Sequence, residues 1–363
     1  MKKFLAVILS GILLTGVSAY GKTASSNIRN ITTAATQNNP NSATRVKASE
    51  EHYIFKLSKN VKREHVYYKN RYGIEIAADL YTSKDINKNK QYPSIVIGPP
   101  FGGVKEQGPG VYANELAQRG FVVIAFDPSY HGYSGGQPRM TGSTDIYAED
   151  FSAGVDYLGT LKYVDREKIG AIGICGSGGF ALSAAAADAR IKAIATSVMY
   201  DISSFGNGVT GEARQQQLNE LAKQRWEDVD NGYPKYNDGY PSAPVEKIPE
   251  NLDPVTAEFF SFYATKRGWH QNALGNITAT SNMSLMNFPS LTHISEITPR
   301  PILFVVGENA HSKGFSETAY ANASEPKEIY EVPNANHVDL YDDTTKIPFD
   351  KFEEFFKDAL KDQ

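Results

Sequence analysis

The single cysteine of the chain lies where a strand pattern gives way to a helix pattern. The segment runs Ile169-Gly-Ala-Ile-Gly173-Ile-Cys175-Gly-Ser177-Gly-Gly179, an apolar stretch that breaks into glycines ahead of an alanine-rich one. A side chain at the apex of such a tight strand-to-helix turn projects above the sheet and is free to react. A helix N-terminus beside an imidazole also makes a thiolate accessible near neutral pH. Cys175 therefore predicts covalent catalysis by a thiol.

Ser177 is an alternative nucleophile in the same turn. It lies two residues before Gly179, and Cys175 lies two residues after Gly173. We favour Cys175 because Gly173 closes the apolar strand, and the nucleophile of this kind of turn follows that glycine by two residues. If Ser177 were the nucleophile, the protein would be a serine-dependent esterase or peptidase.

A thiol nucleophile needs a base, and the chain has seven histidines. His337 is favoured because it follows a predicted strand near the C-terminus and precedes the final predicted helix. Glu308 comes directly after the glycine that ends the previous strand, so we expect it to orient His337 and stabilise its charged form. Asp201 is the alternative acid, and His311 is a further residue that could line the site.

Acyl transfer also needs hydrogen-bond donors for the developing oxyanion. The backbone N–H of Gly176 is one expected donor. The second is expected from the loop Gly98-Pro-Pro-Phe101-Gly-Gly, which follows a predicted strand. Proline has no N–H, so Phe101 supplies the first available amide of this loop.

Strand and helix patterns alternate along the region that must position these residues. Expected strands are 67–81 (an antiparallel pair), 92–97, 121–126, 169–174, 191–199, 302–306 and 328–332, and expected helices are 110–119, 147–161, 180–188 and 348–360. This alternation predicts an α/β fold with a mostly parallel sheet covered by helices on both faces. Residues 201–295 lack strand periodicity, carry a polar helical run at 211–230 and contain an aromatic cluster, which together predict a helical cap over the site.

From about Glu64 to the C-terminus the chain resembles the α/β-hydrolase superfamily, and the turn resembles the Gly-x-Cys-x-x-Gly-Gly form of dienelactone hydrolase relatives. The resemblance implies a core formed by residues 50–200 and 296–363, interrupted by the cap, and hydrolysis of an ester, thioester or lactone. It also implies that Glu106 could contact the resting thiol. Ser177 stands where the serine form has glycine, and Ala310 stands where the usual acid is found.

The remaining features concern location and partners. Residues 1–19 have the basic start, short apolar run and small-residue end of a signal peptide, so we expect a secreted or periplasmic protein without stable membrane insertion of the mature chain. Residues 20–49 are predicted to be a flexible leader. A net charge of -4 gives no reason to expect nucleic acid as a partner, and a small-molecule substrate is expected.

The chain shows no metal-ligand spacing, phosphate loop or dinucleotide fingerprint, so no cofactor or metal is expected. A protein that kept this fold for small-ligand binding without turnover is the alternative from another functional class. The sequence leaves the oligomeric state open.

Overall fold

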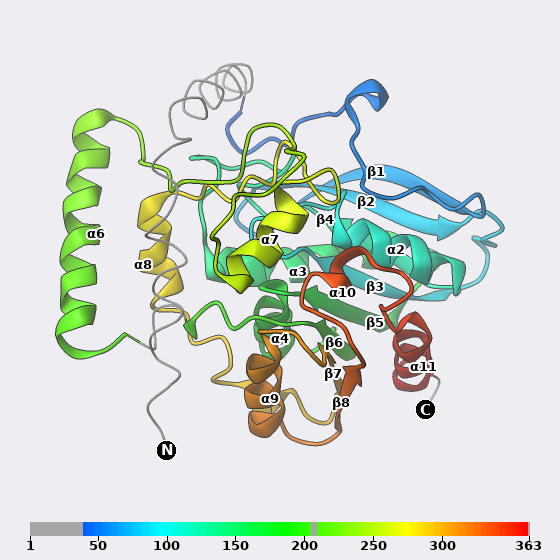
Figure 1. The fold of residues 1–363 in the computed structure, drawn as a ribbon. Helices are drawn as coiled ribbons and strands as arrows, with labels where there is room; N and C mark the ends of the chain where they lie inside the picture. Colours follow the sequence, from blue (N-terminus) through cyan, green and yellow to red (C-terminus); the bar gives the residue numbers. More distant parts are fainter. Residues whose placement is uncertain (1–38, 205–208, 362–363) are drawn as a thin grey trace.

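The computed structural model describes residues 39–204 and 209–361. Its centre is an eight-stranded sheet in the order β1-β2-β4-β3-β5-β6-β7-β8 (Figure 1). β1 and β2 pair antiparallel, β2 pairs antiparallel with β4, and the strands from β4 to β8 are parallel. The strands are β1 (Val61–Lys69), β2 (Glu75–Ser83), β3 (Tyr92–Gly98), β4 (Val122–Phe126), β5 (Val164–Ile174), β6 (Ala193–Ser197), β7 (Ile302–Gly307) and β8 (Lys327–Val332).

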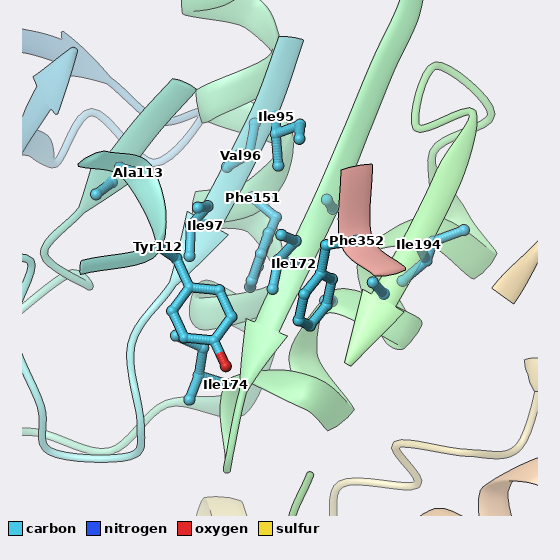
Figure 2. Close-up of a cluster of buried hydrophobic side chains, with 14 of the residues drawn as sticks. Ile95, Val96, Ile97, Tyr112, Ala113, Phe151, Ile172, Ile174, Ile194 and Phe352 are labelled. Carbon is cyan, nitrogen blue, oxygen red and sulfur yellow. The ribbon is translucent and has the colours of Figure 1, made fainter. Parts of the chain in front are cut away.

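Helices cover both faces of this sheet. α2 (Gly108–Gln118) and α11 (Phe349–Ala359) lie on one side, and α3 (Thr144–Thr160), α4 (Ser177–Ala187) and α9 (Lys313–Asn322) lie on the other (Figure 1). Tyr112 of α2 and Phe352 of α11 meet edge to face with ring centroids 5.6 Å apart. Figure 2 shows both rings beside the isoleucines of β3 and β5, so α2 and α11 form one packed layer against the central strands.

The segment between β6 and β7 carries the cap helices α6 (Gly211–Asn231), α7 (Pro254–Tyr263) and α8 (Asn282–Leu285). α7 is well anchored: the Asp253 carboxylate caps it by accepting two backbone N–H groups, and its Phe262 and Tyr263 are buried. α6 lies at the edge of the molecule (Figure 1), and along this fully described helix only Leu221 is buried. The cap therefore packs against the core through α7.

The predicted α/β fold is confirmed, with a mostly parallel sheet and helices on both faces. The leader prediction is wrong for its last part. Residues 40–45 are bound to the core, where the Thr44 N–H donates to the Tyr133 carbonyl and Arg45 pairs with Glu75 at 2.9 Å. A polar, aperiodic composition did not reveal that the fold supplies partners for this backbone. The predicted signal peptide lies outside the described residues.

Candidate active site

Cys175 lies at the sharp turn between β5 and α4. Its φ is +54°, a left-handed conformation that non-glycine residues rarely adopt and that often marks a functional turn. Its N–H donates to the Ser197 carbonyl at 2.9 Å, and its carbonyl accepts from the Tyr200 N–H at 2.8 Å. A Cβ at Gly173 would lie 2.1 Å from the Ser177 carbonyl oxygen, so only glycine allows the chain to turn this tightly. The turn holds the thiol side chain in a single place at the end of a central strand.

Two backbone donors converge on the Cys175 sulfur. They are the N–H groups of Gly176 and Phe101, the pair that the sequence suggested as oxyanion donors. A Cβ on Gly176 would lie 2.8 Å from the Phe101 Cβ, so the two backbones approach closely because residue 176 has no side chain. An oxyanion formed next to the sulfur would meet both donors.

Ser177 has a different position from Cys175. It is the first residue of α4, it is 3 % exposed, and its hydroxyl donates to the Pro99 carbonyl at 2.5 Å. This hydrogen bond connects the loop of Phe101 to the turn that carries Cys175. The geometry therefore gives Ser177 a supporting contact below the site rather than an accessible hydroxyl.

The surroundings keep the thiol protonated at rest. Burial raises the pKa of Cys175 to about 11, against hydrogen bonds with the Tyr341 hydroxyl and the two backbone N–H groups, which favour the thiolate. A thiolate would form here only after a nearby base had removed the proton.

His337 is fully buried, and each ring nitrogen has a hydroxyl partner. Nδ1 lies 2.6 Å from the Ser312 Oγ, and Nε2 lies 2.9 Å from the Tyr341 hydroxyl. Burial, with a smaller effect of the neighbouring His311, holds the pKa of His337 well below its ordinary value. The imidazole is therefore neutral at neutral pH and able to accept a proton.

The structure does not bring either predicted acid to His337. Glu308 is exposed and accepts the Asn334 N–H at 2.7 Å, and Asp201 accepts the hydroxyls of Ser203 and Ser290. Ser312 contacts the imidazole instead, since the chain turns after β7 and carries position 308 outward before position 312 returns to the site. The expectation that Glu308, or alternatively Asp201, orients His337 is corrected accordingly.

A carboxylate of the cap is connected to His337 through His311. Glu258 of α7 accepts the Val338 N–H at 2.9 Å and lies 3.0 Å from Nδ1 of His311. The His311 ring in turn lies 4.7 Å, centroid to centroid, from the His337 ring. His311 thus does line the site, and it links a cap carboxylate to the buried imidazole.

Glu106 belongs to a different cluster. One of its carboxylate oxygens pairs with the buried Lys105 ammonium group, and the other lies 4.0 Å from His270 Nε2 without a hydrogen-bond partner. Burial, with the nearby Asp127 and Asp79 charges, raises the pKa of Glu106 to about 8 against the opposing effect of Lys105. The groups that hydrogen-bond the thiol are Tyr341, Gly176 and Phe101, so the expected contact of Glu106 with the thiol is corrected.

Sequence reasoning missed Tyr341, Ser312 and Glu258. Tyr341 follows His337 by one helical turn, and this i, i+4 spacing was the available signal. For Ser312, the only signal in the sequence was its position two residues after Ala310. Glu258 directly precedes the aromatic cluster of the predicted cap, but nothing in the sequence indicated which way it faces.

Within residues 39–204 and 209–361, His, Cys, Asp and Glu side chains form no group of three or more that could hold a metal ion. None of the helices in the same ranges has both the length and the apolar character needed to span a bilayer.

The chain is similar to several known proteins. The family model described as X-Pro dipeptidyl-peptidase (S15 family) matches residues 72–247, which include the turn at Cys175. PA2218 of Pseudomonas aeruginosa is 50% identical over 84% of this chain and 83% of its own length, and its crystal structure superposes with a TM-score of 0.82 over 87% of this chain and 100% of that one.

Two further relatives extend the comparison. YcjY of Escherichia coli is 36% identical over 75% of this chain and 90% of its own length. The acyltransferase drtE of Aspergillus calidoustus is 24% identical over 79% of this chain and 91% of its length. Together with the fold described above, these matches establish that the chain belongs to the family of PA2218 and YcjY and has the α/β-hydrolase fold.

Proposed function

We propose that the protein hydrolyses an ester, thioester or lactone of a small molecule through an acyl-enzyme on Cys175. The observation that carries this proposal is the convergence of the Gly176 and Phe101 N–H groups on the sulfur of a residue held at φ +54°. The relative drtE is an acyltransferase, which supports acyl transfer as the chemistry. The S15 relationship supports hydrolysis.

In this mechanism the Cys175 sulfur loses its proton to the base and attacks the carbonyl carbon of the substrate. The carbonyl oxygen becomes an oxyanion that accepts the Gly176 and Phe101 N–H groups. Collapse breaks the bond to the leaving alcohol or thiol, which takes a proton from His337 and departs. His337 then takes a proton from water, and the hydroxide attacks the thioester carbonyl. Collapse breaks the C–S bond and releases the acid, and the proton on His337 returns to the Cys175 sulfur.

The site favours a thiol over a serine nucleophile on geometric grounds. The Ser177 hydroxyl donates to a buried carbonyl, and the two backbone donors converge on Cys175. A Ser177→Ala variant would leave the Pro99 carbonyl without its donor, at a cost to stability of about 1–3 kcal/mol. The Ser177→Ala variant would keep Cys175, the proposed nucleophile.

The test is hydrolysis of short p-nitrophenyl esters and of an acyl N-acetylcysteamine thioester by the wild type and by Cys175→Ala, Ser177→Ala and His337→Ala. Intact-mass spectrometry during turnover would detect the acyl adduct. We expect loss of at least about 10³-fold in Cys175→Ala, and an adduct in Ser177→Ala but not in Cys175→Ala.

Three results would redirect the assignment. Full activity in Cys175→Ala would refute the thiol mechanism. Cleavage of an X-Pro p-nitroanilide, with no ester hydrolysis, would favour the peptidase chemistry of the S15 relatives. Tight binding of a small ester without turnover by the wild type would favour a binding protein with a hydrolase fold.

A further inference from the structure

The Tyr341 hydroxyl lies between the proposed nucleophile and the proposed base. It is 2.9 Å from Nε2 of His337, and it hydrogen-bonds the Cys175 thiol and the Tyr263 hydroxyl. Nε2 of His337 therefore contacts a phenol hydroxyl, whereas in a direct Cys–His pair it would contact the thiol. A tyrosine hydroxyl can donate one proton and accept others, so this position permits transfer in both directions.

The surrounding partners permit one consistent assignment of donors and acceptors. The Ser312 hydroxyl donates to the Val198 carbonyl at 3.5 Å, so its lone pair is available to accept the proton on Nδ1 of His337. A neutral imidazole with its proton on Nδ1 has a bare Nε2, which accepts the Tyr341 O–H. The Tyr341 oxygen is then free to accept the S–H of Cys175.

From this arrangement we propose that Tyr341 relays the proton from the Cys175 thiol to Nε2 of His337. This inference deepens the proposed function and rests on it. The S–H bond breaks and its proton forms a new O–H bond on Tyr341, while the original Tyr341 proton moves to Nε2. The products are a thiolate, a neutral tyrosine and an imidazolium, so the total charge is unchanged. To protonate the leaving group, Tyr341 donates its O–H proton to that group while the Nε2 proton of His337 moves to the Tyr341 oxygen.

The burial and packing of these three side chains also favour proton transfer through Tyr341. Cys175 is 6 % exposed, and Tyr341 and His337 are fully buried, so the Tyr341 hydroxyl rather than open solvent lies next to both the thiol and the imidazole. The His337 ring is held by Tyr200 and Phe259, each with its ring centroid 5.4 Å from that of the histidine. The ring cannot swing past Tyr341 to the sulfur without displacing these side chains.

The experiment compares Tyr341→Phe with Tyr112→Phe. The Tyr112 hydroxyl is also buried, and it bonds the carbonyl of Leu340, next to Tyr341, and Ser197. Tyr112→Phe therefore matches the loss of a buried hydroxyl near the same short helix without removing the relay. Two readouts are the pre-steady-state rate of acylation by p-nitrophenyl acetate and the rate of Cys175 alkylation by iodoacetamide from pH 6 to pH 10.

We expect Tyr341→Phe to slow acylation at least tenfold at pH 7.5 and to move the alkylation profile to higher pH. Tyr112→Phe should keep the wild-type profile. In the Tyr341→Phe background, adding His337→Ala should cost less than twofold, because the imidazole has already lost its route to the thiol. Incorporation of 3,5-difluorotyrosine at position 341 keeps the ring and acidifies the hydroxyl, and it should move the acylation profile to lower pH.

Wild-type acylation by folded Tyr341→Phe would overturn the relay, as would full additivity of the two substitutions. An acylation profile unchanged by the fluorinated tyrosine would do so even if Tyr341→Phe failed to fold. These outcomes are distinct from failure of the proposed function, which would appear as retained activity in Cys175→Ala.

Discussion

Gly176→Ala tests the pairing of the two backbone donors. The backbone of Gly176 is helical, with φ -56° and ψ -34°, so alanine fits the local conformation without strain. The new methyl group would lie 2.8 Å from the Phe101 Cβ and 3.1 Å from two carbons of Ile202. To reach ordinary contact at 3.4 Å, the Phe101 and Gly176 backbones must separate by about 0.6 Å.

This displacement should weaken catalysis far more than folding. Overpacking of this kind costs about 1–3 kcal/mol of stability. Loss of one well-placed oxyanion donor lowers kcat by about 10²–10³. We therefore expect Gly176→Ala to fold and to lose roughly a hundredfold in kcat/KM for p-nitrophenyl acetate, with the urea midpoint reporting stability in parallel.

Gly179→Ala is the matched control in the same helix. Its added methyl group would meet only ordinary contacts, the nearest being the Tyr200 carbonyl at 3.4 Å. Alanine inside a helix is favoured over glycine by roughly 0.5–1 kcal/mol, so this variant should be as stable as the wild type or more so, and fully active. Wild-type kcat/KM in Gly176→Ala, or an equal loss in Gly179→Ala, would refute the reasoning.

Two further predictions concern buried polar groups. Ser312→Ala should slow acylation about tenfold to a hundredfold, because Nδ1 of His337 loses its hydroxyl partner. Ser316→Ala, one turn further along α9, removes a buried hydroxyl that has no hydrogen-bond partner among the described residues, and it should leave the rate unchanged. The raised pKa of Glu106 predicts stability that is fully present below the unfolded-state value near 4.5 and is lost as the pH rises through about 8. Glu106→Gln should flatten this loss by up to about 1 kcal/mol per pH unit in urea melts between pH 5 and pH 8.5; an unchanged slope would show that the carboxyl stays ionised against Lys105.

Local patterns were sufficient to predict the parts of the site that depend on one short segment. The strand–glycine–cysteine–glycine–helix order predicted the turn at Cys175, and the Pro-Pro-Phe loop predicted that the first free amide would be that of Phe101. His337 was found because it follows the last strand, a position set by chain order. In each case the residue's neighbours along the chain fix where its backbone points.

The partners of His337 could not be predicted in this way. Whether Glu308 or Ser312 faces the imidazole depends on how the chain turns after β7, where a shift of a few residues exchanges exposed for buried. Glu258 reaches His311 only because α7 packs onto the core from a separate segment. Counting residues from the glycine that ends β7 does not predict which side chains contact His337 and His311.

The sequence by itself determined the fold class, the order of the elements and the backbone positions of the nucleophile turn, because hydrophobic periodicity and glycine placement act over short distances. Only the tertiary structure decided which side chains meet across segments. It turned Ser177 toward Pro99, carried Glu308 out of the site and brought Tyr341 between Cys175 and His337. These contacts depend on packing among helices, loops and strands far apart in the chain, where a small rotation of one element changes every partner.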